Sequence, residues 1–365
     1  MKTADAQPGL LFVPDISGFS NFVNTTAIEH SRHIIEELLE TLIDANELDL
    51  KVSEVEGDAI LFYRFGPPPD AGSFFTQVKR MFIAFHAHLQ RYDSQRICRC
   101  NACSGASGLS LKIIAHQGTI SQARIKEHVK LFGQDVIAVH RLLKNNVPLH
   151  EYALFTRSLV ESWAPGAAPE WASRDAGSSE YDIGTLSYDY APLEPLRKLV
   201  PDPKVEDFGV PGARVHAFSC EVAVKAPMDF VFEVVTDLTK RHEWMAGVKS
   251  VELRNPGLNR IGTQHRCVID PTSPVMVTSA IAHEQNSITF TETDDKKMSC
   301  AVYTFHREGG TQTRVRIDGL IRNALLPRIL FALVLKKKLA TLFGKSLDKL
   351  SHYCEQQYGK VDVRG

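Results

Sequence analysis

Two aspartates near the start of the sequence could together bind a divalent cation. Asp15 follows the apolar run Leu10–Val13 and precedes a Gly/Ser turn, and Asp58 lies at the tip of a hairpin formed by Glu56, Gly57 and Asp58. Mg²⁺ takes oxygen ligands and keeps several waters, so two carboxylates at adjacent strand ends could hold it beside substrate phosphates. The alternative is an ordinary turn and an ordinary hairpin without a shared ligand.

Three closely spaced cysteines form a second group that could bind a metal ion. Cys98, Cys100 and Cys103 lie in a loop, and thiolates at this spacing can surround one soft ion such as Zn²⁺. Zinc would need a fourth ligand, such as His86, His88 or another thiol. No second Cys-x-x-Cys pair follows downstream, so a redox-active loop or a loop without special chemistry are the alternatives.

The elements that must position the aspartates follow from hydrophobic periodicity. Apolar residues between Ile34 and Ile43 recur at helical spacing, as do those between Phe74 and Tyr92, and both patterns predict helices packed on a sheet. Strand patterns alternate with these helices, which is typical of an α/β sandwich. The predicted strands after the first helix are Leu48–Val55, Ala59–Phe65, Leu109–Ala115 and Tyr152–Phe155.

The motifs around the aspartates resemble those of the class III nucleotidyl cyclase catalytic domain. Asp15-Ile-Ser-Gly18-Phe19 matches the family's D-I-x-G-F turn, Gly57-Asp58 matches its G-D hairpin, and His116-Gln-Gly118 matches an H-x-G turn. The segment Gly133–Arg141 resembles a helix that binds ribose and phosphate in that family. The resemblance covers residues 9–160 and implies a ferredoxin-like α/β sandwich.

The resemblance also implies roles for individual residues. Asp15 and Asp58 would bind Mg²⁺ or Mn²⁺, and Arg141 would stabilise the phosphates of a purine nucleoside triphosphate. Glu54 stands at the first base-reading position, where guanylyl cyclases of the family also have Glu. Lys130 stands at the second, and because it only donates hydrogen bonds it could meet a purine carbonyl oxygen or neutralise Glu54.

One departure from the cyclase pattern changes the expected activity. Ile137 stands where the family has an Asn that positions the ribose, and such positioning contributes strongly to the rate. We therefore expect nucleotide binding, or slow or non-standard cyclisation, in place of a fast adenylyl cyclase. The family's arginine comes from the partner protomer, so the resemblance implies a homodimer with composite sites.

The second half of the sequence resembles a different family. A strand pattern at Val215–Val224, a helical segment, six further strand patterns and a long helix from Leu325 to about Gln356 occur in this order. With the motifs Ala226-Pro-Met-Asp-Phe-Val-Phe232 and Asp237 to Trp244, this half resembles the START-like (SRPBCC, polyketide cyclase/dehydrase) superfamily over residues 214–356.

That resemblance implies a helix-grip fold with an apolar cavity for a hydrophobic small molecule or lipid. For every candidate the alternative is an ordinary packed core, and no His/Asp/Glu set in this half points to a reaction. The candidate cavity residues are Trp244, Cys267, Phe290, Tyr303, Phe305, Leu330, Val334 and Phe343.

Composition sets the organisation and excludes some partners. A chain of 365 residues predicts two domains, and we expect a cyclase-like domain over residues 1–162, a linker over 163–210 and a START-like domain over 211–358. Within the linker we expect short elements, with one strand around Ser179–Tyr190. The net charge of −1 gives no electrostatic field that would favour nucleic acid.

The most apolar run, Ala324–Leu335, is too short to span a bilayer. The odd cysteine count and the absence of an amino-terminal signal predict reduced thiols in the cytoplasm.

Two functional hypotheses from different classes follow. In the first, an incomplete nucleotidyl cyclase module binds a purine nucleotide and metal and is regulated by the second domain. In the second, the protein is a non-catalytic carrier or sensor of a hydrophobic ligand, and its cyclase-like half is a dimerisation scaffold.

Overall fold

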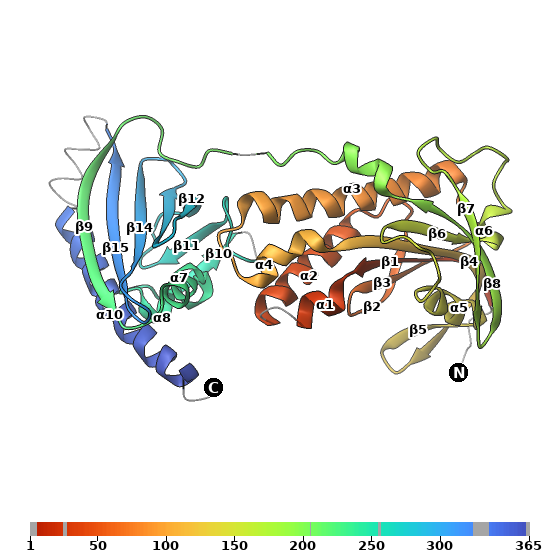
Figure 1. The fold of residues 1–365 in the computed structure, drawn as a ribbon, viewed down its shortest axis with the longest axis horizontal. Coiled ribbons are helices and arrows are strands. Elements are labelled where there is room, and N and C mark those ends of the chain that lie inside the picture. The colour runs from red at the N-terminus through yellow and green to blue at the C-terminus, as the bar shows by residue number, and fades with distance from the viewer. Residues whose placement is uncertain (1–5, 25–27, 205, 255–256, 324–335, 363–365) are drawn as a thin grey trace. The chain divides into compact units, whose positions relative to one another are not determined.

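The computed structural model describes residues 6–24, 28–204, 206–254, 257–323 and 336–362 (Figure 1). The chain divides into two compact units. The amino-terminal domain comprises Met1–Ser94 and Arg99–Pro203, and the carboxy-terminal domain comprises Gln95–Cys98 and Lys204–Gly365. The predicted α+β fold of two domains, a ferredoxin-like sandwich followed by a START-like helix-grip domain, is confirmed. The first four strands of the amino-terminal unit form an antiparallel sheet in the order 2-3-1-4, and a long last helix lies along the sheet of the carboxy-terminal unit (Figure 1).

The amino-terminal sheet has the strand order β2-β3-β1-β4-β6-β8-β7, with β5 paired to β4. The pairing of β4 with β6 is parallel, whereas β1 runs antiparallel to both β3 and β4. The two strands β7 and β8 lie within the stretch that the sequence predicts as a linker. The bounds are β1 Gln7–Ser17, β2 Lys51–Glu56, β3 Ala59–Phe65, β4 Ser110–Ile125, β5 His128–Phe132, β6 Tyr152–Thr156, β7 Asp175–Tyr181 and β8 Gly184–Pro192.

Helices pack on both faces of this sheet, so its central strand β1 is buried on both sides. Alternate residues of a strand point to opposite faces. Phe12 packs edge-to-face against Phe74 of α3, while Leu11 and Val13 belong to a cluster that contains Val136 of α5. Burial of both faces explains why the sequence of β1 contains a continuous run of apolar residues. The helices are α1 Phe19–Asn24, α2 Ile28–Asp44, α3 Ala71–Gln95, α4 Asn101–Gly105, α5 Gln134–Leu142 and α6 Arg157–Val160.

The carboxy-terminal sheet has the strand order β10-β11-β12-β13-β14-β15-β9. The long helix α10 lies along this sheet (Figure 1), where Phe343 stacks on Phe218 and the Cys220 thiol donates to the Ala340 carbonyl. The bounds are β9 Arg214–Val224, α7 Met228–Thr236, α8 Arg241–Trp244, β10 Ser250–Leu253, β11 Gln264–Val268, β12 Met276–His283, β13 Ser287–Asp294, β14 Ser299–Arg307, β15 Thr313–Arg322 and α10 Lys336–Asp362.

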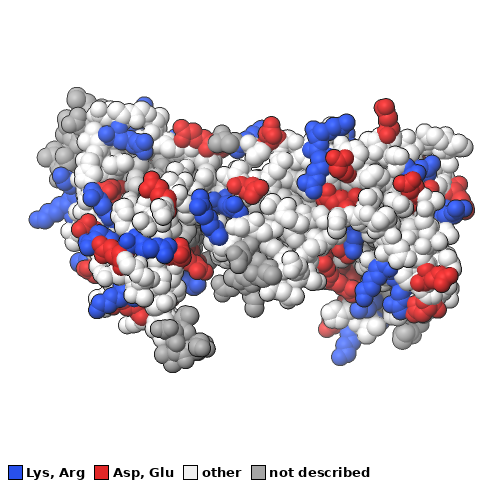
Figure 2. Space-filling model, in the orientation of Figure 1, with Lys and Arg blue, Asp and Glu red and all other residues white. Residues whose placement is uncertain are grey.

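Charged side chains of both signs are interspersed on the face shown in Figure 2. This distribution accompanies the nearly balanced totals of 42 basic and 43 acidic residues. Among the described residues, no helix has both the length and the apolar character needed to cross a membrane.

A buried amide fixes the chain segment that leads into the β2–β3 hairpin. The Gln77 side chain is fully buried, accepts hydrogen bonds from the backbone N–H groups of Glu47 and Leu48, and donates to the Ala45 carbonyl. The Gln77→Leu substitution leaves these backbone groups unpaired, so we expect a loss of about 2–5 kcal/mol in the free energy of unfolding. Urea unfolding would measure it. The exposed neighbour provides the control: Thr76→Ala should change stability by much less, and equal losses would contradict this role for Gln77.

Candidate functional site

The strand pairing brings Asp15 and Asp58 together. Asp15 lies opposite Ala59 in the β1–β3 ladder, and the backbone N–H of Ile16 donates to the Asp58 carbonyl at 3.0 Å. Gly57 adopts a φ of 62°, which a residue with a side chain rarely adopts, and so permits the tight turn that carries Asp58. The Asp15 side chain is buried, and its Oδ2 lies 3.5 Å from Nζ of Lys112 on β4.

The charge on these carboxylates is incompletely balanced. Burial raises the pKa of Asp15 to about 6, Asp58 raises it further, and Lys112 acts in the opposite direction. Burial also raises the pKa of Asp58. A carboxylate with a raised pKa is one whose negative charge lacks sufficient compensation. The carboxylates of Asp15 and Asp58 offer oxygen ligands whose negative charge is not fully compensated. They fit Mg²⁺ or Mn²⁺, which would supply the missing positive charge.

The two predicted base-reading residues contact each other. Nζ of Lys130 on β5 lies 3.7 Å from Oε2 of Glu54 on β2, which is the neutralising arrangement that the sequence left open. His140 on α5, which the sequence reasoning missed, lies 4.0 Å from the other Glu54 oxygen. Because these side chains are substantially exposed, the ion pairs contribute little to stability. Base recognition by Glu54 and Lys130 stays a prediction.

Arg141, the predicted phosphate residue, has a carboxylate partner in its own chain. Its Nε and Nη2 each donate to one oxygen of Asp182 at 2.8 Å, and Asp182 lies at the turn between β7 and β8. The pair is a two-point fork, the geometry in which guanidinium binds carboxylate or phosphate best. Ile137, which replaces the expected Asn, is 46% exposed on α5.

The structure brings the described cavity candidates of the carboxy-terminal domain together in one apolar cluster. Phe343 packs against its edge. Leu330 and Val334 lie outside the described residues. The buried members of the cluster among the candidates are Trp244, Cys267, Phe290, Tyr303 and Phe305.

A charged group that the sequence reasoning missed lies inside this cluster. The Arg241 guanidinium donates to both oxygens of Glu292 at 2.9 and 2.7 Å, and both side chains are almost fully buried. Tyr303 Oη donates to Glu292 at 3.2 Å. A signal for Glu292 exists in the sequence. It follows Ile288 and Phe290 in the inward phase of β13, so a carboxylate at that position must enter the core.

His265 lies beside this ion pair but is neutral. Burial, together with the nearby Arg241 charge, lowers the pKa of His265 to about 4. Its Nε2 lies 3.5 Å from a Glu292 oxygen, so this contact joins a neutral ring to a carboxylate that Arg241 already neutralises. Among the described residues, neither ring nitrogen of His265 has a hydrogen-bond partner, and neither does Nε1 of Trp244.

Burial raises the pKa of Tyr303, and Glu292 raises it further. For Glu292 burial acts to raise the pKa, but the Arg241 charge, the smaller effect of His265 and the hydrogen bonds from Arg241 and Tyr303 together outweigh burial, so the pKa lies below its ordinary value. Near neutral pH the group therefore consists of a neutral phenol, a neutral imidazole and a paired carboxylate.

Comparison with known proteins gives partial matches. Residues 35–152 match a family described as "Protein of unknown function (DUF2652)". The protein of Mycobacterium tuberculosis named Uncharacterized protein Rv2561/Rv2562 is 35% identical over 120 residues, which is 33% of this chain and 56% of that relative. The chain thus spans about half the length of this curated relative.

Solved structures of nucleotide cyclases resemble the chain weakly. The guanylyl cyclase Cya2 is 14% identical with a TM-score of 0.38, covering 52% of this chain and 93% of that one. The adenylyl cyclase CyaB from P. aeruginosa is 12% identical with a TM-score of 0.39, covering 52% and 96%. The guanylate cyclase domain of RhGC from Catenaria anguillulae, in complex with GTP, is 14% identical with a TM-score of 0.37, covering 52% and 98%.

The carboxy-terminal match is to a named family. Residues 215–355 match the model of the family described as "Polyketide cyclase / dehydrase and lipid transport". These are nearly the residues over which the sequence motifs resemble the START-like superfamily. That resemblance is therefore confirmed, and the carboxy-terminal domain matches the polyketide cyclase, dehydrase and lipid transport family.

Proposed function

We propose that the carboxy-terminal domain binds an apolar small molecule or lipid that carries one uncharged polar group. The observation that supports this most directly is His265, a fully buried side chain whose ring nitrogens have no hydrogen-bond partner among the described residues. It lies in a domain whose sequence matches a family that includes lipid transport.

The chemistry of the polar group follows from the side chains around it. An unpaired buried donor or acceptor costs about 1–3 kcal/mol, so a ligand that satisfies it gains affinity. Neutral His265 offers one donor and one acceptor, and the Trp244 indole offers a donor. A carbonyl or hydroxyl group complements them. A charged group would disturb Glu292, whose charge Arg241 already balances.

Binding fits the site better than catalysis does. A general base must be able to take a proton near neutral pH. Glu292 is held in an ion pair, Tyr303 has a raised pKa, and His265 has a lowered one. None of the three therefore resembles a base or nucleophile tuned for reaction near pH 7, and recognition remains as the role of the cluster.

Replacing His265 separates this role from a purely structural one. In the His265→Leu variant we expect affinity for Nile red, an apolar fluorophore with a carbonyl acceptor, to fall about 5- to 100-fold, since one hydrogen bond is lost. The melting temperature without ligand should not fall, because an unpaired polar group has been removed from the core. Fluorescence titration and calorimetry measure the two effects.

The exposed His242 provides the matched control, and His242→Leu should leave both quantities unchanged. Native mass spectrometry of the purified full chain adds an independent measurement, with an apolar molecule expected to co-purify. Loss of stability in His265→Leu with unchanged Nile red affinity would contradict the proposal and make His265 a structural residue.

A second candidate function is binding of a divalent cation and nucleotide by the amino-terminal domain. The specific observation that favours it is the adjacent pair Asp15 and Asp58, with one lysine as counter-charge. A bound Mg²⁺ or Mn²⁺ would supply charge compensation for the nucleotide phosphates. The two aspartates would hold the cation, while the Glu54–Lys130 pair would have to separate before either side chain could meet a purine.

Binding without fast turnover is the expected behaviour of this domain. Arg141 forms a fork with Asp182, so contact with phosphate requires that this ion pair first be broken. Ile137 cannot hydrogen-bond a ribose. Activity would further require a second protomer, because the resemblance implies composite sites in a homodimer.

Removing one carboxylate tests the cation site. We expect the wild-type chain to bind Mn²⁺, detected as loss of the free-ion signal in electron paramagnetic resonance, and Asp58→Asn to bind it at least about 10-fold more weakly because a charged ligand is lost. Glu56→Gln, an exposed acid on the same hairpin, should behave as wild type. Cyclic product from Mn²⁺ with GTP or ATP should be slow or absent. Equal Mn²⁺ binding by Asp58→Asn and wild type would exclude this site.

The raised pKa of Asp15 predicts a pH dependence that needs no metal. Asp15 binds its proton more tightly in the folded state, where its pKa is about 6, than in the unfolded chain, where it is 3.8. Stability is therefore lost as pH rises from about 4 to about 6, by up to about 3 kcal/mol. In EDTA, Asp15→Asn should make this fall smaller, leaving the part that comes from Asp58, as urea unfolding at several pH values would measure. Parallel pH profiles for the two proteins would be inconsistent with a strained carboxylate.

A further inference from the structure

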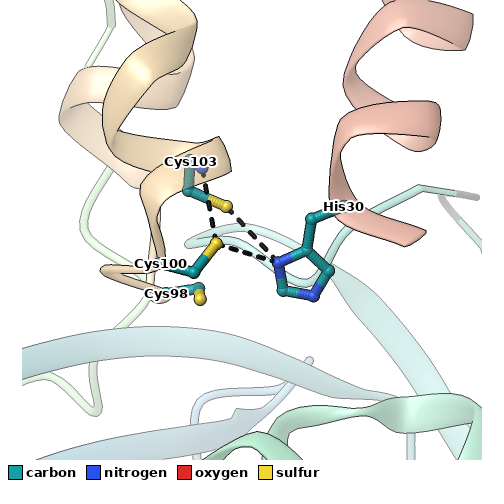
Figure 3. Close-up of side chains that lie close together, drawn as sticks. All are labelled: His30, Cys98, Cys100 and Cys103. Carbon is teal, nitrogen blue, oxygen red and sulfur yellow. Dashed lines mark hydrogen bonds between the residues drawn. The ribbon is translucent and has the colours of Figure 1, made fainter. Parts of the chain in front are cut away.

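We propose that His30, Cys98, Cys100 and Cys103 form a zinc site that is distinct from the aspartate pair. One ligand atom from each residue lies within 4.8 Å of the others. His30 comes from the first turn of α2, and the cysteines come from the chain that precedes and enters α4 (Figure 3). His30, Cys100 and Cys103 point toward one another, and the Cys98 side chain lies beside them (Figure 3).

Two nitrogen–sulfur distances in this group are close to those of a tetrahedral zinc site. Nδ1 of His30 lies 3.1 Å from Sγ of Cys100 and 3.8 Å from Sγ of Cys103. With zinc–sulfur bonds of about 2.3 Å and zinc–nitrogen bonds of about 2.0 Å, the nitrogen–sulfur edge of a tetrahedron is about 3.5 Å. The two nitrogen–sulfur distances lie on either side of this value, so small shifts of these side chains would allow them to bind one zinc ion.

The local structure favours thiolates over a disulfide. None of the seven cysteines, all of which are described, forms a disulfide. The backbone N–H of Cys103 donates to Sγ of Cys100 at 3.5 Å, and such a donor stabilises a coordinating thiolate. Cys103 is buried and the other three ligands are half-buried, which limits exchange with solvent.

His30 takes the place of the two histidines that the sequence suggested as fourth ligands. His86 Nε2 lies 2.8 Å from Glu151, and His88 Nε2 lies 2.9 Å from Glu37, so both rings already have carboxylate partners. His30 is separated from Cys100 by 70 positions in the sequence, and only the packing of α2 reveals it.

The ligand set indicates which ion binds and what it does. Three thiolates and an imidazole select Zn²⁺ over Mg²⁺, which prefers oxygen. Four protein ligands leave no open position, and closed sites of this kind are structural. Zinc would therefore hold the start of α2 against the chain that enters α4.

Metal analysis of the full chain, purified under reducing conditions after expression with added zinc, tests the proposal. We expect one zinc per chain. Replacement by Co²⁺ should give the intense sulfur-to-cobalt charge-transfer band and the visible bands of a tetrahedral thiolate site. A chain without zinc that also fails to bind Co²⁺, or that contains a disulfide among these cysteines, would overturn the proposal.

Ligand variants locate the site. His30→Ala should weaken zinc binding at least about 100-fold, since loss of even a group that supports a ligand costs 10- to 100-fold. His30→Cys should keep the metal and shift the Co²⁺ spectrum toward that of four thiolates, which separates ligand loss from misfolding. His33→Ala, on the same helix, and Cys220→Ser, a distant thiol, are the controls and should retain wild-type affinity. Unchanged zinc affinity in His30→Ala would exclude His30 as a ligand.

Discussion

A charge that is removed from water needs a compensating charge, and each domain contains a buried carboxylate that meets this constraint differently. In the carboxy-terminal domain, Glu292 is almost fully buried and is matched by the two-point contact of Arg241 and by the Tyr303 hydroxyl. In the amino-terminal domain, Asp15 has one basic partner among the described residues, Lys112 at 3.5 Å, and a second acid, Asp58, raises its pKa further. The first arrangement is internally complete, whereas the second has the charge deficit that a cation would fill.

Much of the fold could be predicted because its signals are local. Apolar periodicity gives the helices α2 and α3 and most strands of both sheets, and the short motifs around Asp15 and Asp58 identify a turn and a hairpin whose pairing follows from antiparallel geometry. The apolar candidates from Trp244 to Phe305 are likewise found together, because inward-facing positions of adjacent strands must meet.

The interactions that could not be predicted join residues far apart in the sequence. Arg141 and Asp182 are separated by 41 positions in the sequence, Arg241 and Glu292 by 51, and His30 and Cys100 by 70. No periodicity indicates such partners, because they depend on how the elements pack. The strands β7 and β8 were only partly indicated, as one strand around Ser179–Tyr190, for a related reason: their composition is rich in Gly, Ser and Asp. Pairing of β8 with β6, and of β7 with β8, places them in the sheet.

The pairing of β9 with β15 has a consequence for how the carboxy-terminal domain is made. β9 is its earliest strand in the chain, yet its partner β15 is the last one of the sheet, and the ladder joins Val224 to Thr313 and Arg214 to Arg322. A ribosome must therefore release nearly the whole domain before its first strand finds a neighbour. Until then the apolar side of β9 is exposed to the cell, and a nascent chain that stalls in this interval would be a natural client for chaperones.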